Sequence, residues 1–589
     1  MDPFVADIEV LQSALHQARK VLPTWSEVAD EARQQAVGLN VGQTLFMKTY
    51  GVESEADYKR LAKRQGRIMT HAHIGLDTWK DTKSALLYLH EETSKLGFQV
   101  DRFGLCLDRG MAYPPEMRDR IPAETGPRLR TLQDWMEVGQ VVPIQPHAGD
   151  FMIGFPASMT NTVNALQAGI TTIGNLSQYF AHGTPEWTDE AFTAIETAKA
   201  LALMGSLRSK GAMVHSYLED GYGALFTDYA SVAGWAILEK YLVEDLCGAK
   251  IAHCFGGLTS HPLHRAAWVL LLNDIHGEDS LGSMFYGDTI SATEDGFANL
   301  AINAEQLIWD MALQLLCPTG HAVHPVPVTE AVRIPTAEEI TQIHIFARRL
   351  EAAARRLAPV INLEPAQAIK NHLLSLGQGV FDRALKGLSE SGVDITNPLE
   401  LLFVLKKIGA LRFERLYGAG QVDPAYLGGR KPEALTDMYA RTYARSQLVI
   451  DDLGEVGRGH TGTLLLASTD VHVHGLIIVE RALSSMGFRT ILAGAELSPA
   501  RIARQAAENQ VTGVIVASYN GNALEIAKAV CNELGAVGLK APIFMGGRLN
   551  QADAASNLPR NVENEIGELG VRACSSISDC LRLVDDLVD

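Results

Sequence analysis

The sequence has little positive charge, no paired cysteines and no long apolar run. Lys and Arg total 51 against 69 Asp and Glu, and no basic stripe is visible, so we expect no nucleic-acid partner. The seven cysteines show no paired spacing, which indicates reduced thiols in a cytoplasmic protein. No run approaches about 18 apolar residues, and residues 1–4 lack the basic segment and apolar core that begin a signal peptide. We therefore predict neither a signal peptide nor a membrane span.

One short motif stands out in the C-terminal part of the chain. Asp470, His472 and Gly475 follow the spacing Asp-x-His-x-x-Gly, a signature of cobalamin binding. A cobalt corrinoid needs a lower axial nitrogen donor, and a neutral imidazole held by a carboxylate supplies one of fixed orientation. We predict that His472 is the ligand of the cobalt and Asp470 its hydrogen-bonding partner. Gly475 would open the helix beside the nucleotide tail of the cofactor, where a side chain would obstruct packing. The alternative is a chance loop histidine, since three fixed residues in a short window recur in unrelated chains.

Apolar strands and amphipathic helices alternate around this motif. Residues 462–467 form a predicted buried strand, residues 476–486 a helix and residues 489–493 a second strand. Further elements are expected as strands at 511–517, 541–545 and near Val571, and as a helix over 524–534. This order predicts a five-stranded flavodoxin-like (Rossmann-type) sheet, whose ligands bind at the carboxyl ends of the strands.

This C-terminal module resembles the cobalamin-binding subunit of glutamate mutase and the equivalent domains of methylmalonyl-CoA mutase and methionine synthase. In that family a Ser-x-Leu landmark follows the third strand and a Gly-Gly landmark follows the fourth. Gly546 and Gly547 match the second landmark. The first landmark reads Ala-Ser-Tyr over residues 517–519, so that only Ser518 keeps a hydroxyl. The resemblance implies that these residues contact the cofactor.

A second regularity precedes this module, where short apolar strands alternate with segments long enough for helices. Eight strands are expected to begin near Arg67, Arg102, Val141, Thr171, Ala212, Lys250, Ser283 and Ala322. Eight strand and helix units are the requirement of a closed (β/α)8 TIM barrel. A length of 589 residues accommodates a barrel and one smaller domain.

The predicted fold class is therefore α/β, with a TIM barrel followed by a cobalamin-binding domain. The expected domains are a helical segment over residues 1–66, the barrel over 67–335, a helical tail and linker over 336–450, and the cobalamin-binding domain over 451–589. Residues 417–462, rich in glycine and charge, are the expected linker.

Polar residues gather where the predicted barrel strands end, which is where barrel enzymes place their catalytic groups. In chain order they are His71, His73, Asp108, Arg109, His147, Asp150, His215, His253, Asp288 and His324. Any single histidine of this set could be a hydrogen-bonded core residue. Their shared position predicts a polar, functional mouth.

The barrel region also resembles a known family, the catalytic subunit of glutamate mutase (methylaspartate mutase). The sequence segments on which this resemblance rests are residues 169–171, 176–179, 329–336 and 407–413. The chain thus looks like that catalytic subunit fused ahead of its cobalamin-binding subunit. The resemblance implies an adenosylcobalamin cofactor and an isomerase reaction. In that reaction the cobalt–carbon bond breaks homolytically, the deoxyadenosyl radical abstracts hydrogen, and the carbon skeleton rearranges.

The substrate pocket departs from the family pattern. In the family a trio of arginines grips the two carboxylates of glutamate, because guanidinium pairs bidentately with carboxylate. Here those positions correspond to His71, Ala112 and Gln145, and the family's glutamate on the fourth strand corresponds to Thr172 or Ile173. We therefore expect a different small acid as substrate.

The resemblance also suggests roles for individual side chains. His147 and His215 would orient or protonate the substrate, and Arg109 would hold a single carboxylate. Tyr179 would correspond to one of the tyrosines in the family's substrate pocket, and His324 would contact the adenosyl group. The expected assembly is a homodimer. No membrane or nucleic-acid partner is expected.

Two other functions remain open. One is corrinoid-dependent methyl transfer, although such systems usually place a four-helix cap just before the cobalamin domain. The other is an added metal site. The ligand order of metal-dependent amidohydrolases resembles the order of four histidines here, His71, His73, His215 and His253. In that family an Asp on the eighth strand completes the site, whereas Asp288 here belongs to the seventh.

Overall fold

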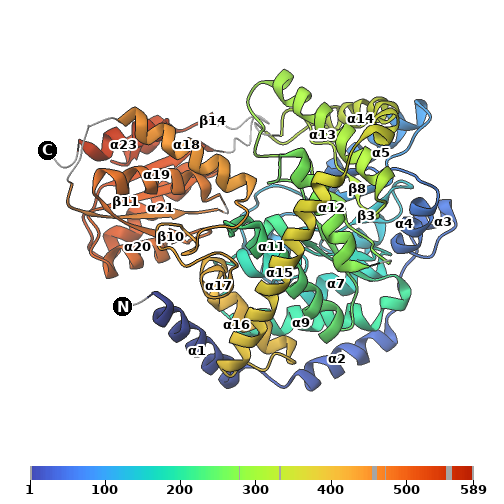
Figure 1. Ribbon diagram of the computed structural model, residues 1–589, viewed down its shortest axis with the longest axis horizontal. Helices are drawn as coiled ribbons and strands as arrows, with labels where there is room; N and C mark the ends of the chain where they lie inside the picture. Colours follow the sequence, from blue (N-terminus) through green and yellow to red (C-terminus); the bar gives the residue numbers. More distant parts are fainter. Residues whose placement is uncertain are drawn as a thin grey trace. The chain divides into compact units, whose positions relative to one another are not determined.

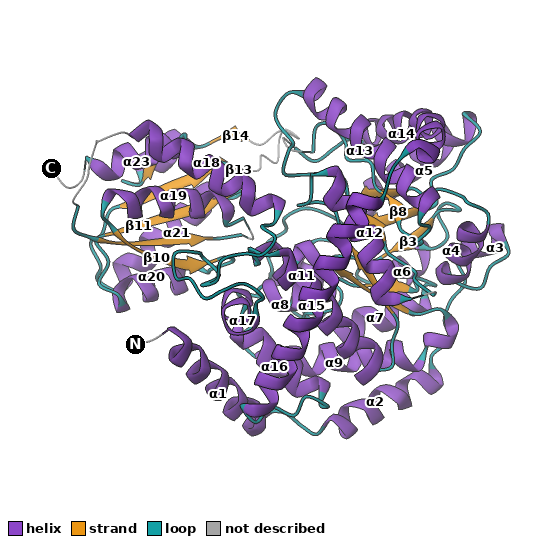
Figure 2. Cartoon of the chain, in the orientation of Figure 1, coloured by secondary structure: helices purple, strands orange, loops and turns teal. Residues whose placement is uncertain are grey.

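The chain divides into two units, Met1–Asp437 and Met438–Asp589. The computed structural model describes residues 3–277, 279–330, 333–453, 460–470, 472–519, 521–551 and 560–586. Residues 331 and 332 of the segment 329–336, and Val471 inside the motif, lie outside the described residues. Among the described helices, none combines the length and the apolar composition needed to cross a bilayer. The helices and strands of both units are shown in Figures 1 and 2.

Eight short parallel strands make up the sheets of the first unit. They are β1 (His71–Ile74), β2 (Arg102–Leu105), β3 (Gln145–His147), β4 (Thr172–Ile173), β5 (Met213–Tyr217), β6 (Ile251–Cys254), β7 (Met284–Phe285) and β8 (Ala322–Val323). They pair in the orders β1-β2-β3, β4-β5-β6 and β7-β8. Isolated parallel bridges join Ala148 to Ile173, Phe255 to Phe285 and Thr70 to Val323. The described pairings among these eight strands are therefore parallel, and strands that follow each other in the chain lie next to each other.

Helices follow the strands and cover them (Figure 2). They are α5 (Trp79–Lys95), α6 (Leu132–Val138), α7 (Ser158–Gln167), α8 (Leu176–Ala181), α9 (Glu190–Ser206), α10 (Tyr222–Leu225), α11 (Tyr229–Lys240), α12 (Pro262–His276), α13 (Gly296–Leu316) and α14 (Ala337–Leu357). Several begin at side-chain caps, such as Thr131 before α6 and Thr336 before α14, each with a reciprocal capping box. Trp135, Trp235 and Trp268 are fully buried in the core.

Further helices flank this arrangement at both ends of the first unit. They are α1 (Pro3–Val21), α2 (Trp25–Gly38), α3 (Leu45–Tyr50), α4 (Glu55–Arg64), α15 (Glu364–Glu390), α16 (Pro398–Ile408) and α17 (Ala410–Tyr417). Helices α15 and α11 approach closely because each contributes a glycine to their contact. A Cβ on Gly377 would lie 2.7 Å from the Cβ of Ala233, and one on Gly234 would lie 2.6 Å from the Cβ of Val380. The small residues thus allow these backbones to pack tightly.

The second unit is a parallel sheet with helices on both faces. Its strands are β9 (Thr463–Ser468), β10 (Arg489–Gly494), β11 (Gly513–Ser518), β12 (Ile543–Gly547) and β15 (Arg572–Ala573), in the order β10-β9-β11-β12-β15. Its helices are α18 (Asp437–Leu453), α19 (His474–Met486), α20 (Pro499–Glu508), α21 (Ala523–Ala536), α22 (Glu563–Glu568) and α23 (Ile577–Asp585). The short strands β13 (Asn550–Gln551) and β14 (Arg560–Asn561) pair separately. An order of 2-1-3-4-5 is that of flavodoxin-like sheets.

The segment expected to be a linker is largely folded. Its first part contains an internal backbone bridge from Val422 to Arg430 and is tied to the rest of the first unit by a bridge from Leu435 to Asp228. Its second part is helix α18, in which Val449, Ile450 and Leu453 pack against the core of the second unit. The expected boundary at residue 450 thus falls inside a helix. Glycine and charge suggested a linker, but the apolar face of α18 is covered by its own unit.

Candidate functional site

The loop between β9 and α19 holds Asp470 and His472 in direct contact. Asp470 Oδ1 accepts hydrogen bonds from Nδ1 of His472 at 2.8 Å and from the His472 backbone N–H at 2.9 Å. The side chain of Asp470 is 2% exposed, whereas that of His472 is 57% exposed. Because Nδ1 donates its proton to the carboxylate, Nε2 carries the lone pair and faces outward. This is the geometry that an axial imidazole ligand needs.

Tyr519 also holds Asp470 in place, and sequence reasoning missed this contact. Its backbone N–H donates to Asp470 Oδ2 at 2.7 Å, so that both carboxylate oxygens are engaged. Its ring lies 5.0 Å from the imidazole of His472, centroid to centroid. Burial and the charge of Asp470 raise the pKa of the Tyr519 phenol, which therefore stays protonated. No sequence signal pointed to a backbone donor, because any residue at this position supplies one.

The predicted glycines and Ser518 lie at the same carboxyl edge of the sheet. Ser518 ends β11 and pairs with Gly547, which ends β12 next to Gly546. Gly547 has a φ of +101°, and a Cβ there would overlap the carbonyl oxygen of Ser518. A Cβ on Gly475 would lie 3.0 Å from the hydroxyl of Tyr519. The predicted cofactor residues of the second unit are thus gathered at one edge, with an exposed imidazole and little side-chain bulk. This arrangement fits a corrinoid.

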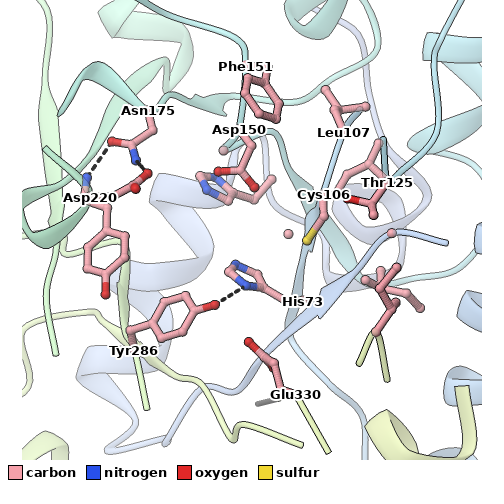
Figure 3. A pocket seen from close by; sticks show the side chains of 18 of the residues that line it. His73, Cys106, Leu107, Thr125, Asp150, Phe151, Asn175, Asp220, Tyr286 and Glu330 are labelled. Carbon is pink, nitrogen blue, oxygen red and sulfur yellow. Dashed lines mark hydrogen bonds between the residues drawn. The ribbon is translucent and has the colours of Figure 1, made fainter. Parts of the chain in front are cut away.

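In the first unit, the carboxyl ends of the strands surround a cavity of 480 Å³, called here the strand-end cavity (Figure 3). The polar side chains that line it are His73, Cys106, Thr125, His147, Asp150, Asn175, Gln178, His215, Tyr217, Asp220, Tyr286, Glu330 and Arg333. They come from the ends of different strands and the loops after them. The predicted mouth residues His73, His147 and His215 are brought together here.

His71, His147 and His215 are buried, His73 is half-buried, and all four are neutral. Burial, with the positive charge of Arg102, lowers the pKa of His73 to about 3 and that of His71, His147 and His215 well below the usual value. His147 Nδ1 donates to the carbonyl oxygen of Thr172 at 3.1 Å, so its Nε2 is an acceptor. These imidazoles therefore serve as hydrogen-bonding groups and carry no positive charge at neutral pH.

His71 and His324 lie close to the cavity residues without lining it. Their ring centroids are 4.9 Å and 4.6 Å from that of His73. Within the described part of the chain, neither nitrogen of either ring has a hydrogen-bond partner. The same part of the chain contains no group of three or more His, Cys, Asp or Glu arranged to hold a metal ion.

Arg109 and Tyr179 lie outside the strand-end cavity. The guanidinium of Arg109 pairs with Glu186 at 2.8 Å and with Glu124 at 3.1 Å, so its charge is already neutralised. Tyr179 is fully buried, and the ammonium of Lys406 lies 4.6 Å from its ring centroid. The role predicted for Arg109, which was to hold a substrate carboxylate, therefore conflicts with its contacts. Its carboxylate partners are distant in the sequence and could not be identified from it.

Carboxyl groups line the cavity, and their charge is opposite to that of Arg109, the residue that sequence reasoning assigned to the substrate. Burial and the charge of Asp220 raise the pKa of Asp150 to about 7. Burial also raises the pKa of Glu330 to about 7, although a hydrogen bond from Tyr286 opposes this. Glu330 was missed as a site residue, yet it lies in the segment 329–336 directly after β8. That position at a strand end was the available signal.

Comparison with known proteins identifies the second unit. Residues 462–562 match the family described as B12 binding domain. The chain carries a B12-binding domain. This domain contains the motif loop, Ser518 and both glycines of β12, and cobalamin is the ligand that its family name indicates.

Two relatives extend the comparison, both from Haloarcula marismortui. Glutamate mutase sigma subunit 1 is 32% identical over 89 residues, which are 15% of this chain and 59% of the relative. Glutamate mutase sigma subunit 2 is 28% identical over 89 residues, which are 15% of this chain and 60% of the relative. The chain thus spans less than two thirds of the length of these relatives. They support a cobalamin-binding family, and the fusion to a catalytic-subunit barrel stays a prediction.

Proposed function

We propose that this protein is an adenosylcobalamin-dependent mutase of the glutamate mutase type, acting on a different small molecule. The observation that carries the proposal is the pair formed by Asp470 and His472 within the B12-binding domain. A buried carboxylate holds one nitrogen of an exposed imidazole at 2.8 Å and leaves the other nitrogen available. That arrangement orients a metal ligand and raises its basicity.

We infer further that the eight strands of the first unit form a closed TIM barrel. Three observations support this: the parallel pairing in chain order, the bridges that link the three sheets, and the bridge from Thr70 to Val323 that links the last strand to the first. A barrel places its active site at the carboxyl ends of its strands. The strand-end cavity lies at those ends and is the proposed substrate site.

The second unit would bind the cofactor, and the first unit would bind the substrate. Bound adenosylcobalamin would supply a carbon radical through homolysis of its cobalt–carbon bond. His472 would ligate the cobalt through Nε2, while Asp470 keeps the proton on Nδ1. In the first unit, the neutral His73, His147 and His215 would orient the substrate through hydrogen bonds. His324 remains the proposed contact of the adenosyl group.

The ligation proposal can be tested by electron paramagnetic resonance of the cob(II)alamin form, with protein carrying nitrogen-15 histidine. A coupling to one histidine nitrogen is expected in the wild-type protein and in His474→Ala, and it should be absent in His472→Ala. A coupling that persists in His472→Ala would show that another group binds the cobalt. Tritium exchange between substrate and the adenosyl methylene would support the mutase. Methyl transfer from a labelled donor to cobalamin would instead favour the methyltransferase alternative.

A further inference from the structure

The charges that line the strand-end cavity are mostly negative. Asp150, Asp220 and Glu330 come from three separate loops, and Arg333 is the cation among the lining residues. Arg333 is already paired with both oxygens of Glu339, at 2.6 Å and 2.9 Å. The lining histidines are neutral because burial disfavours their charged forms. Within the described residues, the cavity therefore has an excess of carboxylate over available cation.

The carboxylates differ in how far their hydrogen-bonding capacity is used. Asp220 accepts from Asn175 at 2.8 Å, from Gln178 at 2.9 Å and from His182 at 3.1 Å. Asp150 receives one long hydrogen bond, from Gln178 at 3.3 Å. Since an ionised carboxylate accepts about four hydrogen bonds, Asp150 has capacity for a ligand donor. Figure 3 shows Asp150 and Glu330 on different sides of the same space.

An independent observation concerns His147, which is 1% exposed and lines the same cavity. Its Nδ1 donates to Thr172, which makes Nε2 an acceptor, and this Nε2 has no partner among the described residues. A buried acceptor without a donor is costly. A ligand that brings an N–H or O–H donor would remove that cost, whereas a carboxylate ligand would not.

We propose that the strand-end cavity binds a substrate with a primary ammonium group, held by Asp150 and by Nε2 of His147, in place of the acid implied by the family resemblance. The proposal rests on the proposed function only in taking this cavity as the substrate site. An ammonium carries three donors and no acceptor, which matches a carboxylate with free capacity and an acceptor imidazole in the lining of one cavity. Glu330 and Asp220 would add to the negative potential around it.

The competing ligand class is a small carboxylic acid, which needs a positive partner when it is desolvated. Arg109, the candidate from the sequence, is held by Glu186 and Glu124 and does not line the cavity. Arg333 is occupied by Glu339, and the lining residues include no lysine. At about pH 8, where Asp150 and Glu330 are ionised, their negative charges would repel an acid in this cavity.

The test uses the full-length protein and three probes with the same four-carbon chain and one terminal hydroxyl. They are 4-aminobutan-1-ol, butane-1,4-diol and 4-hydroxybutanoate, which differ only in the charge of the second end. Binding is measured by calorimetry or ligand-observed nuclear magnetic resonance at about pH 8, where the carboxylates are ionised and the amine is protonated. We expect saturable binding of the amino alcohol, about tenfold or more tighter than that of the diol or the acid.

Variants show whether the binding belongs to this cavity. Asp150→Asn should weaken binding of the amino alcohol by about tenfold or more. Asp30→Asn, a matched change on the exposed part of α2, should leave it unchanged. If Asp150→Asn proves unfolded by circular dichroism, Glu330→Gln takes its place, with a smaller loss expected. Preferential binding of 4-hydroxybutanoate, no binding of the amino alcohol, or binding that is unaffected in the folded cavity variant would each overturn the proposal.

The series is run with and without bound cobalamin, so that two failures can be told apart. Amine binding by a protein that takes up no cobalamin would leave the cavity proposal standing and refute the proposed function. Cobalamin uptake with acid-selective binding would do the reverse.

Discussion

Replacing Asp470 by Asn tests the support of the predicted cobalt ligand. The carboxylate accepts four hydrogen bonds. Three reach Oδ1, two from His472 and a long one of 3.5 Å from the hydroxyl of Ser468, and one reaches Oδ2 from the backbone of Tyr519. An asparagine offers one acceptor oxygen, and its amide nitrogen must face a donor on the other side. The side chain is 2% exposed, so water cannot take over the lost bond. Leaving one buried donor unsatisfied costs about 1–3 kcal/mol.

Two consequences are expected, and they can be measured separately. The free energy of unfolding of the second unit should fall by roughly that amount. Affinity for cobalamin should fall by about 10–100-fold, the usual effect of losing a partner behind a metal ligand, which corresponds to about 1.4–2.8 kcal/mol. Spectrophotometric titration of the full-length protein with cobalamin gives the affinity, and urea unfolding gives the stability.

The matched control is Asp451→Asn on α18, whose exposed carboxylate accepts one hydrogen bond from a described residue, the side chain of Gln447 at 2.8 Å. That variant should bind cobalamin as the wild type does. If Asp470→Asn binds cobalamin with unchanged affinity and an unchanged nitrogen coupling, the carboxylate does not hold the ligand, and the assignment of His472 loses its main structural argument.

Four further outcomes are expected. Gly547→Ala should destabilise the second unit by about 1–3 kcal/mol in urea unfolding because its φ is left-handed, whereas Gly535→Ala, with open space around it, should not destabilise it. Glutamate and 3-methylaspartate should fail to produce cob(II)alamin from the adenosylcobalamin holoenzyme, since the cavity has no unpaired arginine among its described lining residues; efficient conversion would refute this reading. Purified protein should hold substoichiometric zinc, iron or manganese by mass spectrometry, and stoichiometric metal that disappears in a His71→Ala, His73→Ala double variant would favour the metal site. The folded-state pKa of Asp150 is raised to about 7, so its contribution to stability is present at low pH and is lost as the pH rises through about 4 to 7. The free energy of unfolding, measured across that range, should therefore depend less on pH in Asp150→Asn than in the wild type.

Local signals made the second unit predictable. The apolar run in β9, the polar loop and the helix α19 follow each other directly along the chain, so periodicity alone indicates a strand, a loop and a helix. Asp470 and His472 are two residues apart, and their hydrogen bond forms within the loop itself. A contact over so short a separation can be inferred from spacing, because few loop conformations separate the two side chains.

The substrate site was only partly predictable because its decisive contacts are long-range. Arg109 and Glu186 are 77 positions apart, and no pattern near either residue indicates that they pair. The strand ends were visible in the sequence, so the cavity could be located and several of its histidines named. Its charge could not be inferred, since that depends on which cations are already paired.

The histidines of the two units have opposite surroundings, and the difference lies in the neighbours of each ring. A buried carboxylate engages Nδ1 of His472 and the ring itself is exposed, so the remaining nitrogen is available for the metal ligation proposed above. For His147, a backbone carbonyl engages Nδ1 and the whole ring is buried near Arg102, so the remaining nitrogen is a neutral acceptor inside a cavity. The chain has 18 histidines, and their number at the strand ends indicated a functional site, with an added metal site as the less favoured alternative. The partner of each Nδ1 and the burial of each ring distinguish His472 from His147. The ring of His472 is exposed beside a carboxylate, whereas burial and the charge of Arg102 lower the pKa of His147 well below its usual value, although the hydrogen bond to Thr172 opposes this.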